Sequence, residues 1–169
     1  MDVLIQEFTA GWDGPTLIRL AWRLAAAAAL GAIIGMDRER MGKPAGLRTH
    51  MLVCMGAALF VLGPLQSTLP IGDMSRVIQG VATGVGFLGG GAILKLSTER
   101  EILGLTTAAT IWITAALGVT VGLGHTALAV MGLAFAWITL SLVGSAERRF
   151  DPHDDETFAA EKRPRQKSG

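Results

Sequence analysis

The stretch LTTAATIWITAALGVTVGL, residues 105–123, is long and apolar enough to cross a lipid bilayer as a helix. Four further stretches share this property: Leu17 to Met36, Met51 to Leu69, Val77 to Leu96 and Thr126 to Gly144. At about 1.5 Å of rise per residue, such a stretch matches the hydrocarbon thickness of roughly 30 Å. Because lipid offers no partner to a backbone amide, the spans must be helical. The sequence therefore predicts an all-α, polytopic membrane protein, a bundle of five transmembrane helices.

These stretches divide the 169 residues into three parts. Residues 1–16 are predicted to be a short extracytoplasmic N-terminus, and residues 17–144 the five-helix transmembrane domain. Residues 145–169 are predicted to be a charged, disordered cytoplasmic tail. No basic leader precedes the first apolar run and no small-residue cleavage pattern follows it, so we expect the first span to be retained. Cys54 is the only cysteine, which excludes an internal disulfide.

The basic residues are distributed unevenly, although the net charge is only +1. Four lie between the first and second spans, two at or just after the end of the third span (Lys95 and Arg100) and six in the tail. The opposite side carries Arg76 alone, apart from Arg19 and Arg23 within the first span. By the positive-inside rule, the tail and the 37–50 loop are cytoplasmic and the N-terminus lies outside.

A weak internal repeat with an offset of 58 residues runs through the chain. Residues 46–49 and 104–107 both read GLxT, and residues 57–59 and 115–117 both read AAL. A true duplication would make two tandem helical hairpins plus a fifth helix, with the two GLxT segments close together at one mouth of the bundle. Chance similarity stays open, because Gly, Ala and Leu are common in every membrane helix.

The third span is rich in glycine. Its closely spaced members are Gly80, Gly84, Gly86, Gly89, Gly90 and Gly91. Three of them formally match the dinucleotide motif GxGxxG, but no strand precedes the match and no suitable acid follows it, so we reject that interpretation. The small-xxx-small spacing predicts close helix packing instead, with the third span central in the bundle. Packing within one chain and packing between copies in a homo-oligomer are both open.

The spans offer few groups for transport or catalysis. No Asp or Glu lies between the ends of the second to fifth spans, whereas metal passage normally uses oxygen ligands or acidic relays at depth. Thr83, Thr107, Thr110 and Thr114 are polar enough to line a pathway, but Thr in a membrane helix more often bonds its own backbone. No nucleophile–base pair, metal site or nucleotide site stands out. We therefore expect no enzyme activity, no cofactor and no nucleic-acid partner.

Arg23 is the deepest charge in the sequence, one helical turn beyond Arg19. Because no intramembrane acid is available, its side chain can snorkel outward or bond Gln79 or free backbone carbonyls. We favour snorkelling. A functional role for Arg23 requires that it points into the bundle.

Polar residues are densest between the first two spans. The predicted cytoplasmic interaction surface consists of Asp37, Arg38, Glu39, Arg40, Arg48, Thr49 and His50, together with Thr106 and Thr107 from the second GLxT segment. The carboxylates alternate with guanidiniums and are largely neutralised, so they make a poor divalent-cation site. Two interpretations are open: an ion-paired clasp between the first two spans, or a docking surface for a partner protein or an anionic ligand.

Three blocks of the sequence resemble the signature blocks of the bacterial MgtC/SapB family, in order and at the expected separations. They are GMDRERMGKPAGLRTHMLVCMGAAL (35–59), RVIQGVATGVGFLGGGAIL (76–94) and GLTTAATIWITAALGVTVGLG (104–124). The resemblance covers about residues 17–144. Some members of the family carry a folded cytoplasmic domain after the last span, so the resemblance is to the short form without that domain.

The resemblance implies a multi-pass protein of the bacterial inner membrane, linked to growth at low magnesium and, in pathogens, to virulence. It also implies lipid and a membrane protein as partners, the F-type ATP synthase being one candidate for restraint by contact within the membrane. Our leading hypothesis is a non-enzymatic regulator. The alternative is a transporter or channel for magnesium or another ion.

Overall fold

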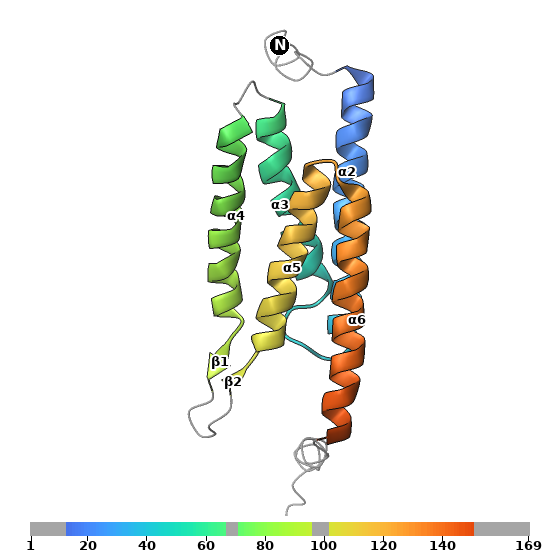
Figure 1. The fold of residues 1–169 in the computed structure, drawn as a ribbon, viewed down its shortest axis with the longest axis vertical. Coiled ribbons are helices and arrows are strands. Elements are labelled where there is room, and N and C mark those ends of the chain that lie inside the picture. The colour runs from blue at the N-terminus through green and yellow to red at the C-terminus, as the bar shows by residue number, and fades with distance from the viewer. Residues whose placement is uncertain (1–12, 67–70, 96–101, 151–169) are drawn as a thin grey trace, which may run out of the picture. The chain divides into compact units, whose positions relative to one another are not determined.

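The structure, a computed structural model, describes residues 13–66, 71–95 and 102–150. These residues form five α-helices and one pair of two-residue strands (Figure 1). The prediction of an all-α protein with five helices is confirmed, since each predicted span overlaps one helix. The chain divides into two compact units, Met1–Leu133 and Ala134–Gly169.

The helices follow one another with short connections. They are α2 (Gly14–Arg40), α3 (Leu47–Leu65), α4 (Ile71–Gly91), α5 (Leu105–Gly122) and α6 (Thr126–Phe150). Between α4 and α5, strands β1 (Leu94–Lys95) and β2 (Ile102–Leu103) pair in antiparallel fashion, which the sequence did not predict. By length and composition, α2, α3 and α5 could each cross a membrane, and α6 contains a shorter apolar segment.

Local sequence explains several helix boundaries. Asp13 occupies the N-cap of α2, and the proline that follows lies in the first turn, where a missing N–H costs nothing. α3 ends at Leu65, one residue after Pro64, which cannot continue the backbone ladder. α4 begins at Ile71 and not at Val77, so its first turn includes Asp73, which lies before the predicted span.

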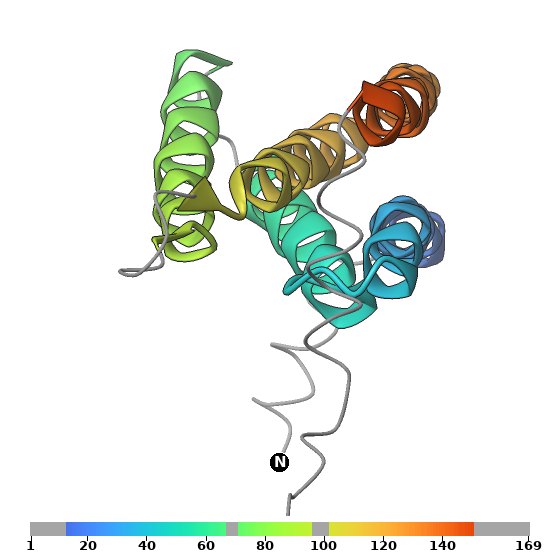
Figure 2. The ribbon, with the colours of Figure 1, turned by 90° about the horizontal axis from the view of Figure 1, so that it is seen from below.

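The first unit is built around α3 and α5, with α2 on one side and α4 on the other (Figure 2). α2 packs mainly against α3 and also against α5, while α4 packs mainly against α5 and also against α3. The prediction that the third span is central is therefore wrong. α5 buries ten residues, whereas the described side chains of α4 include only two buried positions, Val85 and Gly89.

Two apolar clusters hold this unit together. The first joins α2, α3, α5 and the start of α6 and contains Ala27, Leu30, Ile34, Cys54, Ala58, Leu117, Val121, Ala129 and Leu133. The second joins α3, α4 and α5 and contains Ala57, Val61, Val85, Ile111, Ala115 and Val119, with Ala45 from the connection before α3. Most of these side chains are small, so the helices approach closely and gain dispersion contacts along their length.

Glycines create the closest helix contacts. A Cβ on Gly31 of α2 would lie 2.5 Å from the carbonyl oxygen of His50 on α3. A Cβ on Gly118 of α5 would collide with the carbonyl oxygen of Cys54, again on α3, and Gly122 meets α3 one turn further along. Gly31, Gly118 and Gly122 therefore each leave room for the backbone of α3.

Several contacts support the internal repeat. α3 and α5 begin at Leu47 and Leu105, which are 58 residues apart, and each follows a glycine N-cap. Gly31 of α2 meets residue 50 of α3, and Gly89 of α4 meets Ala108 of α5, where a Cβ added to the glycine would lie 3.6 Å from the Ala108 Cβ. The same offset thus relates the helix starts and the contact between the helices of each hairpin. We therefore describe α2–α3 and α4–α5 as two related hairpins.

The second unit continues α6 from Ala134 to Phe150. Along it, the Thr139 hydroxyl donates a hydrogen bond of 2.9 Å to the Phe135 carbonyl, one turn back. The helix thus extends past residue 145, the predicted start of a disordered tail. Residues 151–169 of that tail, like residues 1–12, lie outside the described residues.

Candidate functional site

The polar residues that we singled out converge where α2 ends and where α3 and α5 begin. We call this region the junction and define it by Asp37, Arg38, Glu39, His50, Thr107 and Thr110. After α2, the chain turns through Gly42, whose φ of +66° is readily adopted by glycine. Backbone bonds from Gly42 to Glu39 and from Lys43 to Arg38 close this turn.

Glu39 links α2 to the start of α3. Its carboxylate oxygen Oε2 accepts a 2.8 Å hydrogen bond from the backbone N–H of Leu47. The N-cap of α3 is Gly46, which has no side chain to satisfy this amide. The acid from the preceding helix therefore replaces the missing cap, and its negative charge lies at the positive end of the α3 dipole.

Arg38 is buried beside its own neighbour in the chain. Its Nη2 atom lies 2.6 Å and its Nε atom 3.2 Å from Asp37 Oδ2. The Arg38 side chain is only 4% exposed and that of Asp37 19%, so water screens this pair weakly. The same Nη2 also contacts the sulfur of Met41 at 3.3 Å. The positive charge of Arg38 is thereby compensated within α2.

His50 connects α3 to α5 and is completely buried. Its Nδ1 lies 2.9 Å from the carbonyl oxygen of Gly46, and its Nε2 lies 3.3 Å from Thr110 Oγ1. The Thr110 hydroxyl also lies 2.8 Å from the carbonyl oxygen of Thr107. The ring therefore joins the first turns of the two central helices, and Gly31 of α2 leaves room for the backbone that carries it.

Buried threonines continue inward from the junction along α5. Thr107, Thr110 and Thr114 are each at most 2% exposed. Thr110 donates to the carbonyl of Thr107, and Thr114 donates to the carbonyl of Thr110. On α4, Thr83 likewise donates to the carbonyl of Gln79. The expectation that membrane threonines bond their own helix backbone is confirmed for these three donors.

The remaining residues of the predicted surface lie around the junction and face outward. They are Arg40, Arg48, Thr49 and Thr106, and all four are exposed. The residues of the predicted polar surface therefore fall into two groups. Arg38, His50 and Thr107 form a buried interior, and the four exposed residues form its rim. The ion-paired clasp between α2 and α3 is replaced by the Glu39 bond to a backbone amide.

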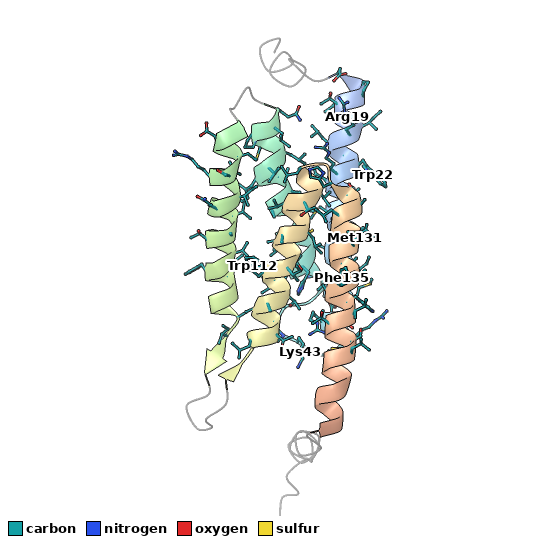
Figure 3. The ribbon with its side chains drawn as sticks, in the orientation of Figure 1. Arg19, Trp22, Lys43, Trp112, Met131 and Phe135 are labelled. Carbon is teal, nitrogen blue, oxygen red and sulfur yellow. The ribbon has the colours of Figure 1, made fainter. Side chains whose placement is uncertain are left out.

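Arg23 lies at the opposite end of the bundle from the junction. Its Nη1 donates a 2.9 Å hydrogen bond to the carbonyl of Gly122, in the last turn of α5. Gly124 adopts a φ of +91°, and a Cβ there would lie 2.6 Å from Arg23 Nη2. Arg23 therefore bonds a free backbone carbonyl, and the outward snorkelling that we favoured is wrong. Such a carbonyl is available because the end of a helix leaves carbonyls unpaired. Trp22, beside it, points away from the bundle (Figure 3).

The glycines of α4 do not pack as the sequence suggested. Among the described residues, only a Cβ added at Gly89 would lie within 4 Å of another helix, at Ala108 of α5. The other five, Gly80, Gly84, Gly86, Gly90 and Gly91, have no atom of the described residues within 4 Å of the position that a Cβ would take. A role for these five in packing within the described part of the chain is therefore excluded.

The chemistry of the junction is that of a structural polar cluster. Its two acids already have partners: Asp37 accepts from Arg38, and Glu39 accepts from the Leu47 amide. Among the described residues, no group of three or more His, Cys, Asp and Glu side chains could hold a metal ion. Our predicted surface missed Thr110, although its position three residues after Thr107 places both on one face of a helix.

Comparisons with known proteins extend this description. A model of the MgtC family matches residues 24–149. The chain is 51% identical to Protein SrpB of Synechococcus elongatus over 133 residues, which are 72% of this chain and 73% of that protein. It is 44% identical to the putative magnesium transporter YhiD of Escherichia coli over 75% of this chain and 59% of that protein.

Protein MgtC of Salmonella typhimurium is 44% identical over 102 residues, which are 60% of this chain and 42% of that protein. The alignments with YhiD and MgtC thus cover less than two thirds of those longer relatives. No solved structure matches the chain.

Proposed function

Because the chain belongs to the MgtC family, we propose that it is a multi-pass protein of the bacterial inner membrane that acts as a non-enzymatic regulator. In this proposal it serves adaptation to low magnesium by restraining a membrane protein through direct contact. The F-type ATP synthase is the partner that we put forward. A part in virulence belongs to the same proposal.

One observation favours a regulator over a transporter. At the junction, where a cation pathway would have to open, both acids are bound by donors of the chain itself, and the buried ionisable residues are Arg38 and His50. A divalent cation needs several oxygen ligands that are free to replace its water. The junction is suited to holding α2, α3 and α5 in one arrangement.

The distribution of basic residues supports the orientation that we propose. Arg40, Lys43 and Arg48 are exposed at the junction end, and Figure 3 labels Lys43 there. The positive-inside rule places this end in the cytoplasm, with the N-terminus outside and the C-terminus inside. The exposed rim would then face the cytoplasmic side of a partner, where acidic side chains would match its charge.

ATP-driven proton pumping in inverted membrane vesicles tests this function. We expect vesicles that contain the wild-type protein to pump more slowly than vesicles without it. The double variant Arg40→Ala, Arg48→Ala should relieve this restraint, because it removes the positive rim and leaves the buried junction intact. The matched control is Arg19→Ala, which removes an exposed charge from the other end of the bundle. Equal pumping with and without the protein would refute the ATP synthase as partner.

A magnesium transporter is the second candidate, favoured by the name of the 44% identical relative YhiD. Purified protein in liposomes that enclose a magnesium-sensitive dye distinguishes the two functions. We expect no magnesium entry above that of protein-free liposomes, with and without an inside-negative potential. Selective, saturable entry that Thr110→Val or His50→Phe reduces would overturn the regulator and establish transport through the junction.

A further inference from the structure

The hydrogen atoms at the junction cannot satisfy all of its contacts while the ring of His50 is neutral. A carbonyl only accepts, so His50 Nδ1, which lies 2.9 Å from the Gly46 carbonyl oxygen, must carry a hydrogen. The neutral ring then has no hydrogen on Nε2, which must accept from the Thr110 hydroxyl at 3.3 Å. That hydroxyl has a single hydrogen, and the Thr107 carbonyl oxygen lies closer to it, at 2.8 Å. Two acceptors therefore compete for one hydrogen.

One added proton removes this competition. When Nε2 of His50 is protonated, it donates to Thr110 Oγ1, and the Thr110 hydroxyl donates to the Thr107 carbonyl. When Nε2 is unprotonated, the hydroxyl turns to the ring, and the Thr107 carbonyl keeps the backbone bond of its own helix. The two arrangements use the same heavy-atom positions. They differ by one proton and by the rotation of one hydroxyl, so Nε2 is the atom that can take up a proton here.

The surroundings of the ring oppose this proton. His50 is completely buried, and a charge without water is unfavourable. The charged residues of α2 at the junction are Asp37, Arg38 and Glu39, of which Arg38 acts on the ring as a like charge. The two acids already accept hydrogen bonds, from Arg38 and from the Leu47 amide. The proton improves one hydrogen bond, whereas burial removes the whole hydration of the charge, so the cost of burial is larger.

The two central helices also disfavour a charged ring. His50 is the fourth residue of α3, and its partner Thr110 is the sixth residue of α5, so the ring lies near the positive ends of two helix dipoles. On α3 itself, the neighbouring charge is the exposed Arg48, which is also positive. α5 contains no ionisable residue that could compensate. We call the junction closed when α3 packs against α5 as in the structure, and open when water reaches the ring. The closed junction holds a proton on the ring less tightly than the open one.

We propose that His50 is a proton-responsive switch, which keeps the junction closed while the ring is neutral and opens it when Nε2 takes up a proton. The neutral ring carries its hydrogen on Nδ1. As the pH falls below about 6.5, the usual pKa of histidine, the open form binds the proton first and the closed form loses stability. One proton is involved, so the equilibrium constant for closing falls by at most about ten-fold for each pH unit.

Opening of the junction changes the exposed rim. Arg40 belongs to α2 and Arg48 to α3, and the closed junction fixes these two helices against each other. In the orientation proposed above, the switch responds to the pH of the cytoplasm, and acid weakens the restraint of the partner protein. This consequence rests on the proposed function, whereas the switch itself is a property of the isolated chain and is tested without a partner.

The native thiol of Cys54 reports opening of the junction in purified protein in liposomes. Cys54 is the only cysteine, is completely buried and lies one turn after His50. Labelling with a dithiodipyridine is followed between about pH 8 and pH 5, on both sides of the usual pKa of histidine. Each rate is divided by the rate for the denatured protein at the same pH, which removes the pH dependence of the thiol itself. We expect this ratio to rise by up to about ten-fold per pH unit below about pH 6.5.

Two substitutions separate His50 from other titrating groups. In His50→Gln, whose amide can still bond but cannot take up a proton, the ratio should not change with pH. His125→Gln is the matched control, because it removes an exposed histidine from the connection after α5, and it should keep the wild-type profile. A constant ratio in the wild type, or the same rise in His50→Gln as in the wild type, would overturn the switch.

Nitrogen NMR of the ring gives a second measurement that needs no change at His50. The chain has three histidines, so His125→Gln with His153→Gln leaves the ring of His50 as the only one. The shifts of its two nitrogens distinguish both neutral tautomers from the charged ring. We expect the Nδ1–H tautomer at neutral pH and the charged ring over the same pH range as the labelling of Cys54. An Nε2–H tautomer, or a ring that becomes charged while Cys54 stays protected, contradicts the proposal.

Discussion

Gly118 and Gly84 are both glycines in the middle of apolar helices, yet their surroundings are opposite. At Gly118 of α5, the carbonyl of Cys54 occupies the place of a side chain, whereas Gly84 of α4 has open space. A methyl group at Gly118 must displace a helix backbone, which a packed interior resists. At Gly84 the same methyl group meets none of the described residues and improves the helix propensity.

We therefore predict that Gly118→Ala lowers the free energy of unfolding by about 1–3 kcal/mol. Gly84→Ala should leave it unchanged or raise it by up to about 1 kcal/mol. Reversible unfolding in mixed micelles, at protein concentrations too low for self-association, measures both variants. Equal destabilisation by the two substitutions would contradict the difference between a packed Gly118 and an open Gly84.

Glu39 provides a second prediction at the residue scale, because it caps a helix from outside that helix. Glu39→Ala should lower the free energy of unfolding by about 1 kcal/mol, the usual value of a lost N-cap. Glu39→Gln should lose less, since an amide oxygen still accepts the bond but lacks the charge. The matched control is Arg40→Ala at the adjacent exposed position, for which we expect almost no change. A loss with Arg40→Ala as large as that with Glu39→Ala would contradict the cap.

At the scale of helices, the bond between His50 and Thr110 joins α3 to α5. Thr110→Val keeps the shape of the side chain but removes the hydroxyl, so the buried ring nitrogen loses its partner. We expect a loss of about 1–3 kcal/mol in the free energy of unfolding. Thr120→Val serves as control, because its hydroxyl bonds only the Ala116 carbonyl of its own helix. Thr110→Ser should restore most of the stability, and equal losses for Thr110→Val and Thr120→Val would exclude a link between the helices.

The helix positions could be predicted from hydropathy, but several of their ends could not. The predicted span from Leu105 agrees with the start of α5, while α3 begins at Leu47 and not at Met51. α4 likewise begins before its predicted span, at Ile71. Hydropathy marks the part of a helix that can lie in hydrocarbon. A helix continues into water as long as its backbone bonds and its cap are supplied.

The candidate site was only partly predictable for a related reason. Charge and spacing indicated that residues 37–50 and the start of the predicted span at Leu105 belong together, and the structure brings them together. They did not indicate that Arg38 and His50 would be buried while Arg40 and Arg48 stay exposed. Burial depends on the neighbouring helix, and a basic residue at a helix end looks the same in the sequence whether or not another helix covers it.

For the whole molecule, we predict that the N-terminus lies on the outer side of the cytoplasmic membrane and that the C-terminus lies in the cytoplasm. The basic rim at Arg40, Lys43 and Arg48 is the main determinant, because translocating such a cluster is unfavourable. A reporter fused at the N-terminus should be active only in the periplasm, and one fused at the C-terminus only in the cytoplasm. Replacing these three residues by Gln should produce a mixed orientation. If that variant kept a single, unchanged orientation, the basic residues of the tail, and not those of the rim, would determine the topology.

The sequence by itself indicated an all-helical membrane protein, located the five helices that the described residues form and indicated the pairing of its hairpins. It could do so because lipid forces long apolar stretches into helices, and because residues repeated at a fixed offset keep their local conformation. Only the tertiary structure decided that α5 is central, that α4 is peripheral and that Arg23 caps α5. A glycine or an arginine is compatible with several neighbours, and which neighbour it meets depends on how all the helices fill space together.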